Sequence, residues 1–484
     1  MPRKILRYIG FAFGAIAILG AVSGGLLFAM LHHFDFSPPQ ASYPRPTSQL
    51  EAQRQDLDYF GRLLAFDRSF SLSTRDRAQR KLLALASLQA PLRPEKLRVA
   101  VIEITALADN GHTHVSSGDG AEPKALPIRV ARFSDGLYVM RARDQYSDVL
   151  GGRVESVDGV PVTDVMRRLE LLRGGLQAWR ELNATYYITI RDILFGADIS
   201  RSPSQSTWTF KLSGGRVATR TFDAYRPAPT EPAPLPVRWY STEPLAGLTS
   251  GWRTLGVTSN TLPVPLRDYA ANFRRIRLPN SCVVFLQLKA ITDVDGQSLG
   301  AFLDDTERDL RSHPPCSVIL DLRYSVGGDF TKIASFGRQL PELVAPNGKI
   351  YVLTTAMTFS ASIATVGFIK QAAGARVSIL GEPVGDRLAF FSEGNSGCLP
   401  NSHLCLDFAT GKNDFTKLCL NPDTCFWLDW IYPIRVRTLA PDEVIPTSFA
   451  EWREGKDPVF DRALALATAK HQDVIRPIGQ IQRP

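Results

Sequence analysis

The stretch from Ser317 to Phe330 reads SVILDLRYSVGGDF, and its pattern decides the fold. Its first half is a short, almost wholly apolar run, which is typical of a strand buried on both faces of a sheet. Gly327 and Gly328 then precede a helical pattern that begins near Phe330. Because glycine has no Cβ atom, this pair can turn backbone N–H groups toward an anion or a developing oxyanion. We therefore predict a strand, a glycine turn and a helix, in that order.

The same alternation continues on both sides of this stretch. Apolar runs at 282–288, 349–353 and 377–380 alternate with helical patterns at 299–310 and 360–373. Continuously apolar strands that alternate with helices predict an α/β core whose sheet is covered on both faces. In such sheets, chemistry gathers at the carboxyl ends of the strands.

A second strand end carries a possible nucleophile. The sequence TFSAS at 358–362 lies between an apolar run and a helix, with Ser360 at the turn. A serine at a helix start is most often an N-cap, and this holds for Ser362 as well. The same geometry also serves a nucleophile, because it exposes Oγ and points the N–H of Ala361 into the same space.

A serine hydroxyl needs a neighbouring base, and His112 can supply it. The helix that Pro94 opens ends near Gly111, and His112 and His114 follow directly. An isolated histidine is more often structural, but two of the seven in this chain lie here. The competing interpretation is a metal site, which two histidines at i and i+2 disfavour because they face opposite sides of a strand. We therefore expect no metal and no cofactor.

Together these motifs resemble the tail-specific (C-terminal processing) serine peptidases, and most closely the Ser/His branch that includes the tricorn core. The resemblance spans about residues 70–470. The motifs that carry it are Leu107-x-Asp109-x-Gly111-His112-Thr113, Asp321-Leu322-Arg323 with Gly327-Gly328, Thr358-x-Ser360-Ala361-Ser362, and Gly374-Ala375-Arg376 leading to Gly381-Glu382-Pro383.

The resemblance implies a ClpP/crotonase-like ββα spiral and a serine endopeptidase acting through an acyl-enzyme. Ser360 would be the nucleophile and His112 the general base. The oxyanion hole would use the N–H groups of Ala361, Gly328 and Gly327. The orienting carboxylate of this branch lies late in the core, where Asp429 is the nearest candidate; Glu393 and Asp407 are its rivals.

The sequence departs from the family pattern in two places. Many members carry a lysine base about twenty-five residues after the nucleophile, but the matching stretch, 382–387, reads EPVGDR. Ser325 stands where an asparagine is usual in the glycine loop. These departures favour a Ser/His pair over a Ser/Lys pair, and they support an alternative function: a non-catalytic protein that binds peptides or other ligands and retains the peptidase fold.

Residues 125–227 change character to short alternating runs and turns, which predicts a β-rich module. Asp158-Gly159 between two valine-rich runs is a hairpin signal. The segment 150–162 is similar to part of a PDZ domain, and such modules bind extended peptide ends at a sheet edge. A plain β insertion without a ligand is the alternative.

The N-terminus predicts a membrane anchor. Ile9 to Leu31 is a run of 23 residues without a charge, preceded by the basic residues Arg3, Lys4 and Arg7. As a helix it would span about 35 Å, enough to cross a bilayer core of about 30 Å, with the basic end in the cytosol. A cleaved signal peptide is the alternative. The bulk of the chain is then expected outside the cytosol.

The six cysteines agree with an oxidising compartment. Four of them lie within 398–425, a stretch whose composition indicates a loop. We expect disulfides between Cys398 and Cys405 and between Cys419 and Cys425, although four cysteines permit three pairings. A zinc site is disfavoured because these spacings lack paired C-x₂-C motifs.

Composition excludes several classes of protein. The hydrophobic fraction of 44% and the charged fraction of 21% exclude a largely disordered chain. The net charge is +8 but no run of five like charges occurs, so we expect no nucleic-acid partner. The expected partners are a polypeptide substrate and the membrane. The predicted segments are a cytoplasmic tail at 1–8, an anchor at 9–31, a proline-rich tether at 32–48, a helical segment at 49–124, the PDZ-like module at 125–227, a linker and cap at 228–277, the peptidase core at 278–470 and a tail at 471–484.

Overall fold

The computed structural model describes residues 18–26, 37–228, 230–231, 240–243, 245, 248, 250–256 and 262–472. Most of the predicted membrane span, 9–31, lies outside these residues, and its described part, 18–26, is helical. No helix within the described ranges combines the length and the apolar character needed to cross a bilayer. The predicted tail from 473 onward also lies outside the described residues.

A six-stranded sheet forms the centre of the core, in the order β16-β13-β12-β11-β10-β9. Its members are β9 (Phe273–Arg277), β10 (Val283–Leu288), β11 (Ser317–Asp321), β12 (Lys349–Thr354), β13 (Val377–Gly381) and β16 (Glu443–Val444). Strands β10 to β13 are parallel, and β9 pairs with β10 in the antiparallel sense. Every residue of β10 and β11 is buried, as the apolar runs predict.

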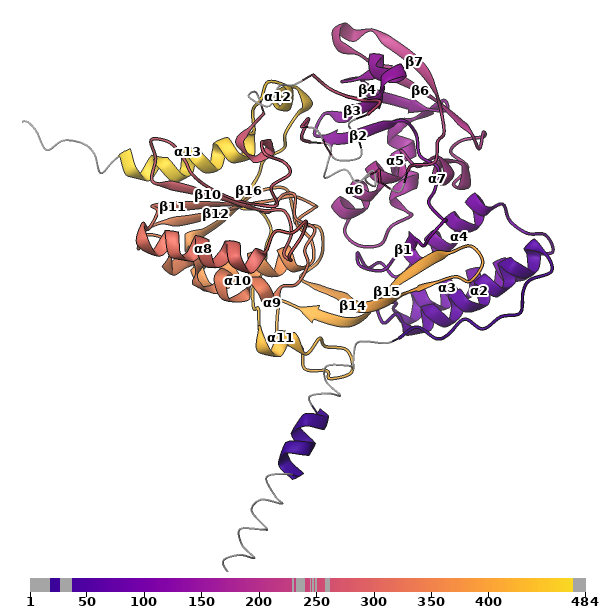
Figure 1. Ribbon diagram of the computed structural model, residues 1–484, viewed down its shortest axis with the longest axis horizontal. Helices are drawn as coiled ribbons and strands as arrows, with labels where there is room; N and C mark the ends of the chain where they lie inside the picture. The colour runs from indigo at the N-terminus through magenta and orange to yellow at the C-terminus, as the bar shows by residue number, and fades with distance from the viewer. Residues whose placement is uncertain are drawn as a thin grey trace, which may run out of the picture.

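Helices cover both faces of this sheet, which confirms the predicted α/β core. Figure 1 shows α8 (Leu299–Ser312), α9 (Thr331–Gln339) and α10 (Ala361–Ala373) on one face and α13 (Pro458–Gln472) on the other. Ten of the thirteen residues of α10 are buried, so this helix is fixed on all sides. Its N-terminus therefore has a well-defined place at the carboxyl edge of the sheet.

The β-rich module contains the predicted hairpin at Asp158-Gly159, where both residues have positive φ. Its strands are β2 (Ile128–Phe133), β3 (Gly136–Arg143), β4 (Arg153–Val157), β5 (Val160–Pro161), β6 (Gln205–Lys211), β7 (Val217–Asp223) and β8 (Trp252–Thr254). Three helices not expected from the alternating pattern complete it: α5 (Val162–Glu170), α6 (Gln177–Tyr187) and α7 (Arg191–Gly196). They bury valine, leucine and isoleucine side chains against the sheet.

The N-terminal part consists of α2 (Gln49–Phe66), α3 (Leu72–Ala86) and α4 (Pro94–Ala106), closed by a hairpin from far along the chain. The hairpin strands β14 (Ala389–Cys398) and β15 (Leu404–Asp414) form a three-stranded sheet with β1 (His114–Ser117). Figure 1 shows this hairpin, in orange, extending from the core to the indigo helices. It therefore ties the two parts together.

The hairpin corrects part of the expectation of a loop at 398–425: residues 404–414 form β15, whereas 415–424 contain no helix or strand. Glycines, asparagines and Pro400 make the composition turn-like, but β15 pairs on both sides, with β14 and with β1, and its backbone is satisfied as a strand. Cys398 and Cys405 lie directly opposite each other and form a disulfide. The pairing of Cys419 with Cys425 is also as expected, and Cys282 is joined to Cys316. All six cysteines are paired.

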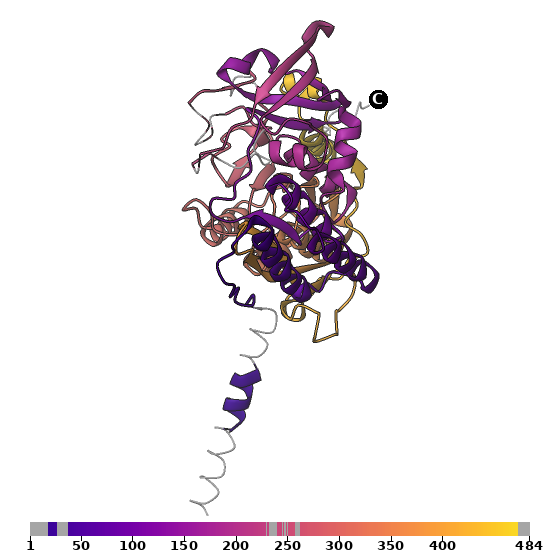
Figure 2. The ribbon, with the colours of Figure 1, turned by 90° about the vertical axis from the view of Figure 1, so that its right-hand side faces the viewer.

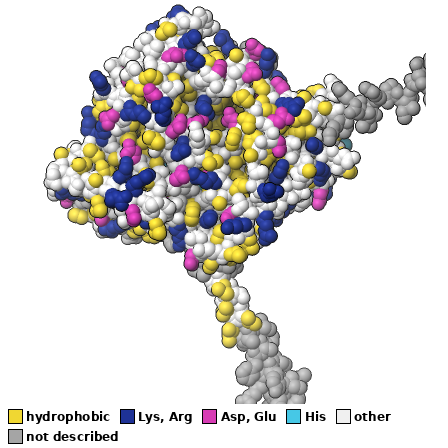
Figure 3. Space-filling view, turned by 180° about the vertical axis from the view of Figure 1, so that it is seen from behind, with side chains coloured by type: hydrophobic (Ala, Val, Ile, Leu, Met, Phe, Trp, Pro, Cys, Tyr) yellow, Lys and Arg dark blue, Asp and Glu magenta, His cyan; other side chains and the backbone are white. Residues whose placement is uncertain are grey.

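The module, the helices and the core pack against one another. In Figures 1 and 2 the magenta module lies above the indigo helices, next to the core. An apolar cluster that includes Phe133 of β2, Tyr324 and Met357 of the core and Trp452 of α12 (Phe449–Arg453) joins module and core. Figure 3 shows lysine and arginine side chains scattered among acidic and apolar ones on the face seen there, without a basic stripe.

Candidate active site

Ser360 lies in a strained turn between β12 and α10. Its backbone angles are φ 54° and ψ −124°, a region that a residue with a Cβ atom rarely occupies. A nucleophile elbow, in which a serine stands on a sharp turn from strand to helix, has this kind of strain. The side chain of Ser360 makes no N-cap hydrogen bond, so the ordinary capping role does not account for it.

The turn is held in place from the neighbouring strand end. Thr358 Oγ1 donates a hydrogen bond of 2.9 Å to the carbonyl of Leu322, which directly follows β11. The N–H of Phe359 donates to the carbonyl of Ser325 at 3.2 Å. These two bonds fix the elbow against the glycine loop, because both acceptors belong to the chain that leads into Gly327 and Gly328.

Gly327 touches the serine directly. A Cβ atom at Gly327 would lie 2.7 Å from the Cβ of Ser360 and 2.9 Å from the N of Ala361, so only glycine fits there. Ile291 pairs with the two residues that flank Gly328: its N–H donates to the carbonyl of Gly327, and its carbonyl accepts the N–H of Asp329. No described residue accepts a hydrogen bond from the N–H of Gly327, Gly328 or Ala361. These amide groups are therefore available to an anion beside Ser360.

Ser325 and Ser362 act as a buried brace. Their Oγ atoms lie 2.7 Å apart, and both side chains are inaccessible to solvent. Ser325 thus connects the loop that contains Gly327 and Gly328 to the first turn of α10. Because Ser362 is buried and already hydrogen-bonded, it is not available as a nucleophile. Ser360, by contrast, is partly exposed.

His112 lies beside the elbow within a stack of aromatic rings. Its ring centroid is 4.4 Å from that of Phe359, the residue before the nucleophile, and 5.0 Å from that of Phe390 on β14. Trp179 of α6 also stacks on Phe359, with ring centroids 3.9 Å apart. The histidine from the N-terminal part is thus brought against the residue that directly precedes Ser360. Among the residues that the structure describes, neither ring nitrogen of His112 has a hydrogen-bond partner.

A buried carboxylate faces this histidine. Nδ1 of His112 lies 3.6 Å from Oδ2 of Asp386, whose side chain is completely buried. The separation is a little longer than a hydrogen bond, as is common in free catalytic sites before a substrate binds. Oδ1 of Asp386 accepts the backbone N–H of Arg387 at 2.8 Å, which leaves Oδ2 for the imidazole.

Gly111 allows these groups to approach. A Cβ atom on Gly111 would lie 2.8 Å from the ring of Phe359 and 2.9 Å from Oδ2 of Asp386. Any larger side chain would push the histidine segment away from both the elbow and the carboxylate. The glycine that precedes the histidine is therefore a steric requirement of the site.

The histidine segment is anchored by distant parts of the chain. Arg173 of the module donates a 3.0 Å hydrogen bond to the carbonyl of Gly111, and Arg387 forms an ion pair of 2.8 Å with Asp109. The backbone N–H of Phe391 donates to Oδ1 of Asn110 at 3.3 Å. Module, core and hairpin each hold one residue of the segment 109–111, so the position of His112 depends on all three.

His114 is turned away from the site. Its Nδ1 lies 3.0 Å from the carbonyl of His112, and its Nε2 lies 3.3 Å from Asp407. Burial and the charge of Arg173 lower the pKa of His114 to about 4, against the opposing effect of Asp407. No group of three or more histidine, cysteine or acidic side chains in the described ranges is arranged to hold a metal ion.

The structure places Asp386 beside His112, and it places the carboxylates suggested by the sequence elsewhere. Oδ2 of Asp429 accepts the backbone N–H of Asp414 at 3.3 Å. Burial and the neighbouring charges of Glu393 and Asp414 raise the pKa of Asp429 to about 7. Glu393 accepts a hydrogen bond from Ser392, and Asp407 lies next to His114. None of the three is within ion-pair distance of His112 in the part of the chain described.

Sequence reasoning had a signal for Asp386 that it did not use. Asp386 stands in the stretch 382–387, about twenty-five residues after Ser360, where many members of the family carry a lysine base. A carboxylate in place of that lysine is the signal that points to a partner for His112. The roles of Trp179 and Phe390 have no sequence signal, because aromatic residues are common in any core.

Comparison with solved structures shows which known proteins have a similar fold. A serine-to-alanine mutant of CPAF matches with a TM-score of 0.58 at 15% identity, over 90% of this chain and 99% of that chain. Mature CPAF complexed with lactacystin matches with a TM-score of 0.55 at 15% identity, over 88% and 99%. This chain shares the fold of CPAF. The likeness to CPAF agrees with the fold expected from the tail-specific peptidase motifs, and at 15% identity it concerns the fold alone.

The other comparisons add less. The tricorn protease matches with a TM-score of 0.38 at 12% identity, too low a score to carry an argument. No protein-family model matches the sequence. No curated protein matches it either.

Proposed function

We propose that this protein is a serine endopeptidase that hydrolyses polypeptides through a Ser/His/Asp mechanism. The observation that carries the proposal is the position of His112. Its ring packs on Phe359, next to the strained Ser360, and its Nδ1 faces the buried carboxylate of Asp386. A histidine between a serine and a carboxylate is the arrangement that activates a hydroxyl. The CPAF-like fold supports the same conclusion.

In the first half of the reaction, Oγ of Ser360 attacks the carbonyl carbon of a peptide bond while Nε2 of His112 takes the hydroxyl proton. The carbonyl oxygen becomes anionic and is held by the N–H groups of Ala361, Gly328 and Gly327. Asp386 fixes the tautomer of the imidazole and stabilises the imidazolium. The imidazolium then gives its proton to the leaving amine as the C–N bond breaks.

In the second half, water attacks the acyl-enzyme ester. His112 takes a proton from the water, and the new oxyanion occupies the same amide groups. When the ester bond breaks, the imidazolium returns its proton to Oγ of Ser360. The product acid leaves, and the enzyme is restored without any external reductant, oxidant or metal being consumed.

A second function, peptide binding without catalysis, is favoured by one observation. Within the described part of the chain neither nitrogen of His112 is hydrogen-bonded, so the base is not engaged with Ser360 in the free protein. Catalysis then needs a small approach of the imidazole when a substrate binds. The two functions differ in whether the hydroxyl of Ser360 is nucleophilic.

Labelling with a fluorophosphonate separates these functions. The purified wild type is expected to become covalently labelled, and Ser360→Ala is expected to abolish the labelling. Ser362→Ala, in the buried brace, is the matched control and should keep the label on Ser360. Absence of labelling in a folded wild type, with retained binding of peptides, would favour the binding protein. Lactacystin offers a second probe, since CPAF has been solved with it.

We also propose that the chain works outside the cytosol, held to the membrane by the segment 9–31. The support is the 23-residue uncharged run with its basic flank and the three disulfides, which fit an oxidising compartment. The full-length protein in cells is expected to remain in the membrane pellet after alkaline extraction. Its cysteines should resist alkylation until a reductant is added, and reactive thiols in freshly lysed cells would contradict the assignment.

A further inference from the structure

A cavity of about 340 Å³ lies between the β-rich module and the core, and neither Ser360 nor His112 lines it. Its floor is at the carboxyl ends of β11, β12 and β13, where it is bordered by Arg323, Thr354 and Glu382. Its roof comes from β2 and α6 of the module. The volume is within the range of about 300–1,000 Å³ typical of ligand pockets, and ligands in α/β sheets bind at this edge.

The cavity is next to the elbow along the chain. Met357 lines it three residues before Ser360, and Tyr324 lines it three residues before Gly327. Three residues span at most about 10 Å. In the roof, Ala178 precedes Trp179, whose ring stacks on Phe359. A peptide whose carbonyl is held at Ser360 can therefore reach this cavity with a side chain only a few residues away.

Most of the charges around the cavity are already paired. Arg132 lies 2.6 Å from Glu181, and Lys456 lies 2.7 Å from Glu454. Arg323 is held between two carboxylates, those of Asp321 at 2.9 Å and Asp457 at 2.8 Å. Each cation of the cavity wall is therefore already paired with one or two carboxylates.

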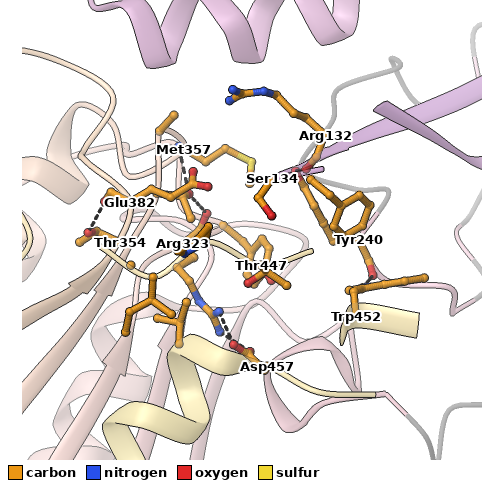
Figure 4. Close-up of a pocket in the computed structure, with 18 of the residues that line it drawn as sticks. Arg132, Ser134, Tyr240, Arg323, Thr354, Met357, Glu382, Thr447, Trp452 and Asp457 are labelled. Atoms are coloured by element: carbon orange, nitrogen blue, oxygen red, sulfur yellow. Dashed lines mark hydrogen bonds and ion pairs between the residues drawn. The ribbon is translucent and has the colours of Figure 1, made fainter. Parts of the chain in front are cut away.

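Glu382 is the exception. In the part of the chain that the structure describes, its carboxylate makes no hydrogen bond and no ion pair, and its side chain is accessible. Figure 4 shows it reaching into the cavity from the β13 side, with Arg132 across the opening. Of the two carboxylates that line the cavity, Asp457 is already paired with Arg323, and only Glu382 has no cation bound to it among the described residues. Desolvation and the charge of Glu181 raise the pKa of Glu382, against the opposing effects of Arg132 and Arg323.

The remaining wall is largely apolar, with Phe133, Leu182, Met357 and Trp452 among its residues. A ligand with an aliphatic stem and a cationic end suits such a wall, because the stem packs on the apolar surface while the cation meets the carboxylate. A neutral apolar side chain would leave the carboxylate of Glu382 without a partner, and an acidic one would be repelled.

We propose that this cavity is the specificity pocket for a lysine or arginine side chain of the polypeptide substrate, and that Glu382 receives its cation. The proposal rests on the peptidase function and names its substrate class. Selection occurs within a few residues of the scissile bond. Glu382 acts as a specificity residue, separate from the groups that perform the chemistry.

Cleavage profiling tests the proposal. Matched peptide libraries that carry lysine, norleucine or glutamate at each position are given to the wild type, Glu382→Gln and Glu382→Lys. At one position, the wild type is expected to prefer lysine to norleucine in kcat/KM by roughly tenfold or more. Glu382→Gln should remove most of this preference, and Glu382→Lys should reverse it toward glutamate. Glu443→Gln, at an exposed ion pair with Arg462, is the matched control and should leave the preference unchanged.

Two further measurements keep the possible failures distinct. Fluorophosphonate labelling of each variant reports on the nucleophile. A folded, labelled Glu382→Gln with wild-type selectivity would overturn the pocket assignment and leave the peptidase intact. If the wild type does not label, the peptidase function fails. Equilibrium binding of the lysine and norleucine peptides to Ser360→Ala, with and without Glu382→Gln, then decides the pocket: selective lysine binding that depends on Glu382 supports it, and equal binding refutes it.

Discussion

The elbow that carries Ser360 and the segment that carries His112 are positioned in different ways. The elbow is fixed by adjacent strand ends of a single sheet: Thr358 bonds to Leu322, and Gly327 packs on the serine itself. The histidine segment is held by residues from three other parts of the chain, among them Arg173 and Arg387. The nucleophile is therefore a property of the core alone, whereas the base depends on how module, core and hairpin assemble.

This difference predicts how the two regions respond to mutation. Changes at the elbow should act on the reaction and on local strain with little effect elsewhere. Changes around His112 should reduce turnover in proportion to the displacement of the imidazole. The following variants, taken from the largest expected effect to the smallest, test this contrast.

Asp386→Asn should cause the largest loss. Asparagine keeps the shape, but it has no charge to stabilise the imidazolium and can present an N–H to Nδ1, so the wrong tautomer is favoured. We expect kcat to fall by roughly 10⁴-fold, as for the equivalent change in other triads. Steady-state kinetics on a fluorogenic peptide measure this. Asp429→Asn is the matched control, and a greater loss from that variant would return the orienting role to Asp429.

Asp429→Asn should instead change stability with pH. The pKa of Asp429 is raised from 3.8 to about 7 in the folded protein. The contribution of Asp429 to the free energy of unfolding is therefore complete below about pH 4, and it is lost as the pH rises through 7. Asparagine does not titrate, so the variant should gain roughly 3 to 4 kcal/mol relative to wild type between pH 4 and pH 8. Denaturant unfolding at both pH values checks this, and a pH-independent difference would contradict it.

Gly111→Ala should reduce turnover without removing any catalytic group. The new methyl group would lie 2.8 Å from Phe359 and 2.9 Å from Asp386, so the histidine segment must move. A displacement near 1 Å can cost about 10²-fold in rate, and we expect a loss of this order. Kinetics with the same peptide measure it. Gly120→Ala, where a Cβ has open space although φ is positive, is a control for glycine replacement away from the site; equal losses from both would refute the steric argument.

Ser360→Gly should have the smallest effect of the series, a gain in stability. Glycine relieves the strain of φ 54° and ψ −124°, although it adds conformational freedom to the unfolded chain. We expect the glycine variant to be more stable than Ser360→Ala by about 1 kcal/mol, while both lack labelling. Thermal unfolding compares them. A less stable glycine variant would show that the turn is not strained.

Most of the core could be predicted from the sequence because its signals are local. The apolar runs correspond to β10 to β13, and the glycine pair and Ser360 lie at the strand ends where they were expected. The β14–β15 hairpin could not be predicted. Its glycines and asparagines resemble a loop, and β15 pairs not only with β14 but also with β1, nearly 290 residues earlier.

The sequence by itself determined the order of strands and helices from β10 to β13, the serine at the turn and the two short disulfides, because each depends on residues close together along the chain. Only the tertiary structure decided which carboxylate faces His112 and where a side chain of the substrate can bind. Asp386 meets His112 across 274 positions, and the cavity beside Glu382 has walls from the module and the core. Such contacts are set by the packing of whole segments, which no local pattern of residues encodes.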